Sequence, residues 1–499
     1  MKNLFALAAN LCLVLLLVPP RSPAASTFTP AAAQGDRQCF PQTGECLEGE
    51  FRQYWEQNGG LPVFGYPVAP ARPEIDPANN SIFLVQWFER NRFELHPENK
   101  PPYRVLLGRL GDQLLRQTGR DPLALPKANA SAQHYFPETG HSIAAQFWDY
   151  WRTHGLDLGD AGTSHRESLA LFGYPMSEAQ MEPTAGGQPV LTQWFERARF
   201  EYHPNNPESS RVLLGLLGNE MNVTSPRKAL DRLNYYRQQV GAPAVEQHPS
   251  LVVSAQGHAN YLVLNGESSN PHVQAAGRPG YTGAEILERV KAAGYGYTSG
   301  YRVSNVLVPI EDPAASIDAL VDMPLHRVVI LNTDYRQAGY GRAALAPDPV
   351  AGRKSKVAYS VLDLGTGPLD TMPSRDPYLL AYPIDTQTGV PTSWNYLEFP
   401  NPLPAGATLP AGYPFTLQGA YGPLKVDEAA MRDSSGQVVA VHPSSPLCQA
   451  AAYNCFIMVP VAPLRPNTAY SVRARGTVGK MSFDRTWQFT TGATGVPQR

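Results

Sequence analysis

A histidine followed by an apolar turn makes the segment 326–341 the part of the sequence best suited to chemistry. His326 begins this segment, and an apolar run, an Asn-x-Asp turn and a Gly-x-Gly strand start follow it. Imidazole is the side chain that most readily binds a metal or exchanges a proton near neutral pH. The pattern predicts a histidine at the start of a helix, followed by a turn and a strand.

Other reactive residue types give little support to nucleophilic catalysis. No Gly-x-Ser-x-Gly sequence occurs. Outside the N-terminal apolar run the cysteines form two equally spaced pairs, Cys39/Cys46 and Cys448/Cys455. In an exported chain such pairs predict two small disulfide loops, which leave no free thiol. Their spacing does not suit a zinc cluster, which would want Cys-x2-Cys or a nearby histidine.

The elements that must position His326 are predicted within residues 226–366. One helix starts at 226, and a second runs from Pro249 to near Gly266 and contains His258. Shorter helices at 285–290 and 312–322 precede strands at 339–341 and 357–363. Helices separated from a late antiparallel sheet indicate an α+β domain. We expect His258 to face inward, where a structural role is favoured over a ligand role.

Composition predicts an exported protein of several domains. A chain of 499 residues is too long for one hydrophobic core, so three or four domains are expected. A net charge of −2 with 17% charged residues argues against a nucleic-acid partner or an anionic membrane surface. Residues 1–25 combine Lys2, a short apolar run and small residues, which is typical of a secretory signal peptide; an uncleaved anchor is the alternative. No second long apolar run follows, so no transmembrane segment is expected after signal cleavage.

An internal repeat divides the first half of the chain. QWFERNRFELHP at 86–97 aligns with QWFERARFEYHP at 193–204, and VFGYP at 63–67 aligns with LFGYP at 171–175. The repeat predicts two small α+β modules at 39–116 and 135–221. The second copy carries about a dozen extra residues between Thr153 and Glu167 and lacks both half-cystines. The tryptophans at 87 and 194 are expected in the core, with a sugar-binding platform as the alternative.

The C-terminal part, 380–492, has a different pattern. Short alternating runs, Pro/Gly turns and one disulfide loop predict an all-β sandwich. The run Leu464–Tyr470 before Ser471 is typical of a tyrosine corner. This part resembles bacterial immunoglobulin-like modules, and the repeats resemble cell-wall-associated LGFP-type repeats.

The segment 226–366, with its final His326 run, resembles the CAP superfamily (SCP-like extracellular domains). The resemblance implies an α-β-α sandwich with a cleft formed by four positions, which fall here on His272, Asn305, Asp318 and His326. In the family this cleft can hold a divalent metal, often zinc. Two of the four positions depart from the family, because Asn305 and Asp318 stand where glutamates are usual.

These departures bear on the metal. Two neutral imidazoles and one carboxylate, His272, His326 and Asp318, can supply three zinc ligands with an open fourth position. Asn305 offers a carbonyl without charge, so we expect a weaker site and no general base beside a metal-bound water. The alternative is that both histidines are structural.

Three functions are therefore open for a secreted, extracellular or cell-surface protein of bacterial type. The first is non-enzymatic binding of a small apolar or cell-envelope ligand in the CAP cleft. The second is metal-assisted hydrolysis using the two histidines and Asp318. The third is a structural adhesin or cell-wall-binding role carried by the repeats.

Overall fold

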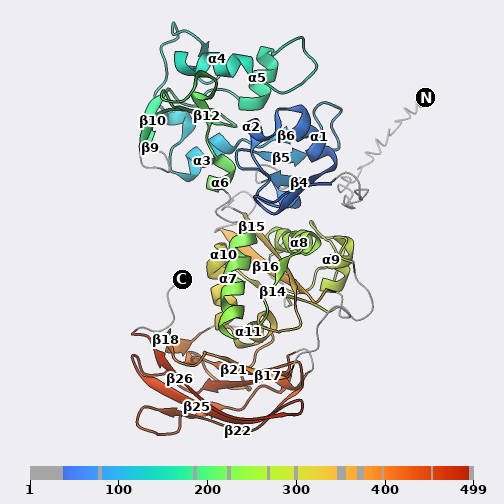
Figure 1. Cartoon of the computed structure of the whole chain (residues 1–499), viewed down its shortest axis with the longest axis vertical. Helices are drawn as coiled ribbons and strands as arrows, with labels where there is room; N and C mark the ends of the chain where they lie inside the picture. Colours follow the sequence, from blue (N-terminus) through green and yellow to red (C-terminus); the bar gives the residue numbers. More distant parts are fainter. Residues whose placement is uncertain are drawn as a thin grey trace, which may run out of the picture.

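Two copies of one element order form the N-terminal part of the computed structural model (Figure 1). The structure describes residues 37–76, 81–183, 188–221, 226–266, 270–296, 302–345, 356–367, 376–395, 398–450 and 453–493. The predicted signal peptide at 1–25 lies outside these residues. No helix of the described part is long and apolar enough to span a membrane.

Each module consists of a short hairpin, helices and a four-stranded antiparallel sheet. The first contains β1 (Arg37–Phe40), β2 (Glu45–Glu48), α1 (Gly49–Gln57), α2 (Gly60–Phe64), β3 (Arg72–Ile75), β4 (Ile82–Trp87), β5 (Arg92–Leu95), β6 (Val105–Leu107) and α3 (Leu110–Gln117). The second contains β7 (Tyr135–Phe136), β8 (His141–Ser142), α4 (Ala145–Thr153), α5 (His165–Phe172), β9 (Gln180–Pro183), β10 (Pro189–Trp194), β11 (Arg199–Tyr202), β12 (Val212–Leu214) and α6 (Leu217–Met221). The equivalent strands pair in the same order, β3-β4-β5-β6 and β9-β10-β11-β12.

The last helix of each module packs against the other module. The Gly111 amide in α3 donates to the Glu196 carbonyl at 3.0 Å, and the Asn219 amide in α6 donates to the Glu89 carbonyl at 3.1 Å. A Cβ at Gly111 would lie 1.9 Å from the Phe195 carbonyl oxygen, so only glycine permits this approach. An apolar cluster joins both helices to Trp87 and Trp194, which are 8% and 5% exposed. Both tryptophans are therefore core residues, as expected.

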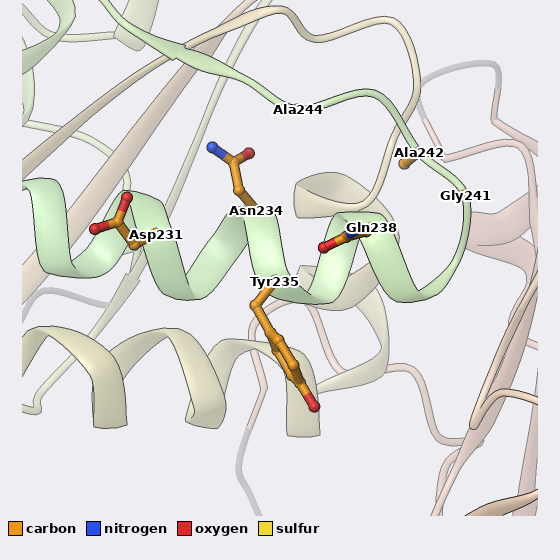
Figure 2. Close-up of a pocket in the computed structure, with 7 residues that line it drawn as sticks. All are labelled: Asp231, Asn234, Tyr235, Gln238, Gly241, Ala242 and Ala244. Carbon is orange, nitrogen blue, oxygen red and sulfur yellow. The ribbon is translucent and has the colours of Figure 1, made fainter.

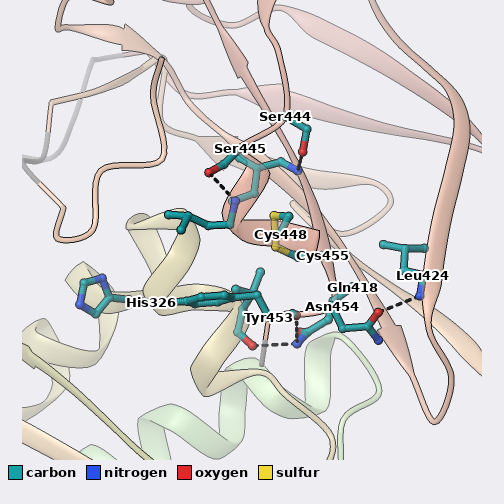
Figure 3. Close-up of a disulfide and its surroundings, with 12 residues drawn as sticks. His326, Gln418, Leu424, Ser444, Ser445, Cys448, Tyr453, Asn454 and Cys455 are labelled. Atoms are coloured by element: carbon teal, nitrogen blue, oxygen red, sulfur yellow. Dashed lines mark hydrogen bonds between the residues drawn. A yellow bond between two sulfur atoms is a disulfide. The ribbon is translucent and has the colours of Figure 1, made fainter. Parts of the chain in front are cut away.

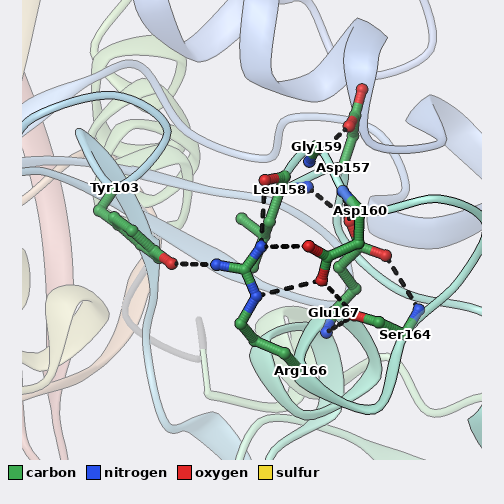
Figure 4. Close-up of polar contacts among 8 residues, drawn as sticks. All are labelled: Tyr103, Asp157, Leu158, Gly159, Asp160, Ser164, Arg166 and Glu167. Carbon is green, nitrogen blue, oxygen red and sulfur yellow. Dashed lines mark hydrogen bonds and ion pairs between the residues drawn. The ribbon is translucent and has the colours of Figure 1, made fainter.

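The extra residues of the second module form a loop between α4 and α5. Glu167 organises the loop, because its carboxylate accepts the backbone amides of Leu158, Asp160 and Ser164. Arg166 bonds Asp160 on one side and the Tyr103 hydroxyl of the first module on the other (Figure 4). The insertion therefore also ties the two modules together.

The middle domain places its longest helices against a sheet of order β13-β15-β16-β14. Its elements are α7 (Pro226–Gln239), β13 (Glu246–Gln247), α8 (Pro249–Asn265), α9 (Ile286–Ala292), β14 (Val303–Val308), α10 (Pro313–Asp322), α11 (Pro324–Ile330), β15 (Gln337–Leu345) and β16 (Val357–Gly365). The helices at 249–265 and 313–322 agree closely with the sequence prediction, whereas β14 was not predicted.

The Gly-x-Gly start of β15 has a packing reason. A Cβ at Gly339 would lie 2.0 Å from the Leu251 backbone, and one at Gly341 would lie 2.1 Å from the Gln256 amide nitrogen. Side chains at these positions would push α8 off the sheet. The two glycines therefore set the distance between α8 and β15.

The C-terminal part contains two four-stranded sheets that share one core. Their orders are β17-β21-β24-β23 and β18-β26-β25-β22. The strands are β17 (Tyr378–Tyr382), β18 (Gln387–Val390), β21 (Phe415–Ala420), β22 (Leu424–Asp433), β23 (Val441–His442), β24 (Cys455–Pro460), β25 (Ala469–Val478) and β26 (Met481–Thr491), with a small β19 (Ser393–Trp394) and β20 (Ala411–Gly412) pair between them. The Tyr470 hydroxyl accepts the Arg465 amide at 2.8 Å, which is the predicted tyrosine-corner bond.

The middle domain and the C-terminal sheets are joined by apolar packing rather than by a linker alone. One buried cluster contains residues of both, and α11 contributes Leu325 and Val328 to a second cluster around Trp394. Arg327 is fully buried between them, donates to the carbonyls of Val321 and Pro414, and lies over the rings of Tyr382 and Tyr413. Helix α11, which carries His326, is thus held from both sides.

Candidate functional site

Three separate elements bring His272, Asn305 and His326 together. His272 lies in the loop between α8 and α9, Asn305 on β14, and His326 in the first turn of α11. The two imidazole rings face each other with centroids 6.3 Å apart and planes inclined by 25°. The structure thus places the two predicted histidines side by side.

His272 is a half-buried ring between two acceptors. Its Nδ1 lies 3.1 Å from Asn305 Oδ1, and the Phe399 carbonyl is a second hydrogen-bond partner of the ring. Burial lowers the pKa of His272 most strongly, and the nearby charges of His326 and Arg289 lower it further against the two hydrogen bonds. The ring is therefore neutral at physiological pH and has a single N–H, so it donates to only one of these two oxygens at a time.

His326 is bonded to a carboxylate that comes from the C-terminal part. Glu398 Oε1 accepts both the backbone amide and Nδ1 of His326, each at 2.7 Å. The Glu398 side chain is 0% exposed and that of His326 is 8% exposed. With the carboxylate oxygen as acceptor, this bond places the ring proton on Nδ1, and Nε2 is the ring nitrogen left without a hydrogen bond among the described residues.

Asp318 makes its hydrogen bonds on a different face of the domain. Its Oδ1 accepts from Arg232 Nε at 2.6 Å and from the Tyr236 hydroxyl at 2.7 Å, so the carboxylate holds α10 against α7. Of the four positions implied by the resemblance, three therefore meet in one place. The carboxylate bonded to a cleft histidine belongs to Glu398.

A buried polar group lies behind His272. Asn305 and Asp363 are directly opposite each other on β14 and β16, so their side chains leave the same face of the sheet. Ser254 Oγ donates to Asp363 Oδ2 at 2.6 Å, and Arg289 Nη1 donates to the His272 carbonyl at 3.1 Å. Burial raises the pKa of Asp363 to about 7, partly offset by Arg289 and Ser254. Asp363 is thus an acid that titrates near neutrality.

Several polar atoms of this region have no hydrogen-bond partner in the described part of the chain. They are Arg289 Nε and Nη2, Asn305 Nδ2, Asp363 Oδ1 and Glu398 Oε2. Such atoms are costly to bury. The protein interior next to His272 is therefore polar, although apolar clusters pack nearby.

His258 has the structural role that was expected. It is fully buried, its Nε2 lies 3.0 Å from the Pro271 carbonyl, and Gln274 Nε2 donates to its Nδ1. Burial is the first cause that holds its pKa well below the usual value. The ring fixes the start of the loop that carries His272.

The described residues do not fit a zinc site of three protein ligands. No group of three or more His, Cys, Asp or Glu is placed to hold a metal within them. His272 Nδ1 lies against Asn305 Oδ1, Glu398 lies on the Nδ1 side of His326, and Asp318 bonds Arg232. The lone pair of His326 Nε2 is free to bind a metal, but these residues do not supply the three converging ligands of a catalytic zinc site.

Two open hollows lie away from the histidines. One, of about 580 Å³, follows α7 and the turn after it (Figure 2). Its groups do not converge, because Tyr235 points to the opposite side of the helix from Asn234, whose amide is bonded to Val245. The other, of about 370 Å³, lies between the two modules and is lined by the α1 end, the inserted loop and His154.

Both predicted disulfides are formed, Cys39–Cys46 and Cys448–Cys455. The second belongs to the apolar cluster that contains Leu325 and Val328 of α11. Figure 3 shows it near that helix, with the His326 ring pointing away from it. The disulfide supports the packing that holds His326 and takes no part in the histidine pair.

Glu398 and Phe399 are the site residues that sequence reasoning missed. They lie in the irregular stretch between β19 and β20, where no periodic pattern or motif sets them apart. Phe399 is 48% exposed, and its ring centroid lies 6.5 Å from that of His272. Only the fold of the C-terminal part brings these residues to the histidines.

Comparison with known proteins finds one family match, in the middle domain. Residues 230–349 match the family model described as CAP, cysteine-rich secretory protein family. No curated protein matches the chain.

Among solved structures, 21 chains match. An outer surface protein of Borrelia burgdorferi shares 16% identity and a TM-score of 0.22, over 28% of this chain and 90% of its own. A cysteine-rich secretory protein of Staphylococcus aureus shares 10% identity and a TM-score of 0.19, over 61% of this chain and 90% of its own. The family match spans the segment that carries Asn305 and His326.

Proposed function

We propose that this protein is an extracellular CAP-domain protein that binds a ligand at the His272–His326 pair and catalyses no reaction there. The observation that carries the proposal is the bonding of the two rings. The Asn305 amide holds His272, the Glu398 carboxylate holds His326, and Nε2 of His326 has no hydrogen-bond partner among the described residues. Such a pair recognises a hydrogen-bond donor, whereas a catalytic triad would need a hydroxyl or thiol bonded to that nitrogen and a metal hydrolase would need further ligands.

Export is supported by the two disulfides, because such bonds persist in oxidising compartments. The residues around the histidine pair indicate the class of ligand. Phe399 offers a half-exposed apolar ring beside the polar histidines. A small molecule with an apolar body and one hydroxyl or amide donor fits both features.

Cholesterol is a suitable probe, since it has one hydroxyl on an apolar body. We expect the full chain to bind radiolabelled cholesterol from detergent micelles, with His272→Ala and His326→Ala each weakening binding about tenfold or more. Glu428→Ala serves as the control, because Glu428 is 64% exposed on β22. Binding that both histidine variants leave unchanged would overturn the proposed site.

The same preparation tests the hydrolase alternative. Zinc is measured in freshly purified protein and in His326→Ala. Stoichiometric zinc that disappears in this variant would replace the binding proposal with metal-assisted hydrolysis.

Attachment to the cell envelope through the repeats is a second candidate, favoured by the hollow between the modules. In that case the modules act like the LGFP-type repeats they resemble, and the C-terminal sheets act as an immunoglobulin-like spacer. A sedimentation assay with purified peptidoglycan sacculi tests it, using His154→Ala in the hollow and His442→Ala in the C-terminal sheets as the matched control. Loss of sedimentation in His154→Ala alone supports attachment through this hollow, and equal sedimentation of all three proteins contradicts it.

A further inference from the structure

The described residues on either side of 396–397 connect the C-terminal part with the CAP domain. Trp394 in β19 is 1% exposed and packs with Leu325 and Val328 of α11. A few residues later Glu398 meets His326, and Phe399 meets His272. One short segment therefore touches both imidazoles of the pair.

Glu398 acts on two atoms of His326 at once. Its Oε1 accepts the backbone amide in the first turn of α11, which satisfies a donor that the helix itself leaves free. The same oxygen accepts from Nδ1. Because this bond requires the proton on Nδ1, it selects one tautomer and leaves the Nε2 lone pair as an acceptor.

Free imidazole has no such restriction, so the position of the proton depends on Glu398. Asp318, the carboxylate that the resemblance implies for the cleft, is no substitute, because it is bonded to Arg232 and Tyr236. The burial of Glu398, with a side chain that is 0% exposed, also keeps water from competing for Nδ1.

We infer that the C-terminal β-domain completes the ligand site of the CAP domain, with Glu398 as a positioning residue for His326 and Phe399 as the apolar wall beside His272. The site then takes a molecule that donates a hydrogen bond to His326 Nε2 and packs an apolar surface against Phe399. This inference rests on the proposed function for its ligand, whereas the tautomer of His326 can be measured without one.

The first experiment measures that tautomer in the full-length protein. Histidines are labelled with ¹⁵N, and the His326 signals are assigned by their loss in His326→Asn. At pH 8 we expect the pattern of a ring protonated on Nδ1 in the wild type and in Glu428→Ala. In Glu398→Ala we expect a shift toward the ring protonated on Nε2. An unchanged pattern in Glu398→Ala, or an Nε2-protonated wild type, overturns the inference.

The second experiment measures cholesterol affinity in the same variants. Glu398→Ala should weaken binding about 10- to 100-fold, as is usual when the partner of a functional histidine is removed. Glu398→Gln keeps an acceptor of the same shape, so it should restore most of the affinity and guards against a variant that fails to fold. Phe399→Ala should weaken binding without any change in the tautomer.

The two readouts separate the possible failures. A tautomer shift in Glu398→Ala with no cholesterol binding by the wild type supports the positioning role and overturns the proposed function. Wild-type binding that Glu398→Ala does not weaken overturns the inference and leaves the proposed function intact.

Discussion

Asp363 links the stability of the middle domain to pH. It is fully buried, and its pKa is raised from 3.8 to about 7, first by burial. Below about pH 4 the acid is protonated in both the folded and unfolded states. As pH rises toward 7, the unfolded chain loses the proton first, so this group removes about 4 kcal/mol of folding stability, and the loss levels off above that pH.

The variant Asp363→Asn tests this dependence, because the amide stays neutral at every pH. We expect the free energy of unfolding of the variant, minus that of the wild type, to increase by a few kcal/mol between about pH 4 and pH 7. Urea titrations at several pH values measure it. Asp149→Asn is the control, since Asp149 is 80% exposed. If the difference in unfolding free energy between variant and wild type does not change with pH, Asp363 is ionised in the folded protein at neutral pH.

At the level of single residues, the sequence predicted the histidine pair but not the carboxylate that bonds His326. His272 and His326 carry recognisable contexts, and the structure brings their rings together. Glu398 has no such context, because an irregular loop has no periodicity to reveal which way a side chain faces. The carboxylate of Asp318 could not be placed from sequence either, because its contact with Arg232 depends on how α7 crosses α10.

Among the elements, the contact between α8 and β15 leaves the least room for change. Both Gly339 and Gly341 lie where an added Cβ would meet the helix backbone at about 2 Å. A backbone contact cannot relax as the end of a long side chain can. The site depends on this contact, because α8 also carries Ser254 and His258 behind His272.

We therefore expect Gly341→Ala to lower the free energy of unfolding by about 3 kcal/mol, or to prevent folding. The matched control is Gly296→Ala, because a methyl group added at Gly296 would meet no other atom within 4 Å. Urea unfolding followed by circular dichroism compares the two. Equal stability of both variants would mean that α8 can move away from the sheet without cost.

Element prediction was good where caps and periodicity agree, and poor where they do not. The helix Pro249–Asn265 begins at a proline and ends before Gly266, whose backbone φ is +74°. Both residues are strong local signals for the ends of a helix. Strand β14 has mixed burial along Val303–Val308 and no alternating pattern. The pairing of α3 and α6 across the modules depends on tertiary contacts that no local pattern shows.

For the whole molecule, shared cores predict which parts unfold together. The middle domain and the C-terminal sheets have common apolar clusters, and Arg327 is buried between them. The first N-terminal module meets the middle domain through the Asn260 amide, which donates to the Pro73 carbonyl at 3.0 Å, and through Ile75, which packs against the apolar cluster of α8. We expect calorimetry to show two transitions, one for the modules and one for the middle domain with the sheets.

Arg327→Met should lower only the second transition. The variant loses the hydrogen bonds to Val321 and Pro414 and the contacts with two tyrosine rings, about 3 kcal/mol in all. The midpoint of the first transition should not move. Arg485→Met, at an exposed position on β26, is the control. A parallel fall of both transitions in Arg327→Met would show that the chain unfolds as one unit.

The exchange of last helices between the two modules has a consequence for how this chain could be shortened or rebuilt. Each module depends on the other to cover the apolar surface around Trp87 or Trp194. Deleting one module would expose this surface to solvent on the remaining module and leave its last helix without a packing partner. The shortened protein would then tend to aggregate. The smallest portable piece of the N-terminal half is therefore the duplicated pair, and any transplant into another protein would have to move both copies at once.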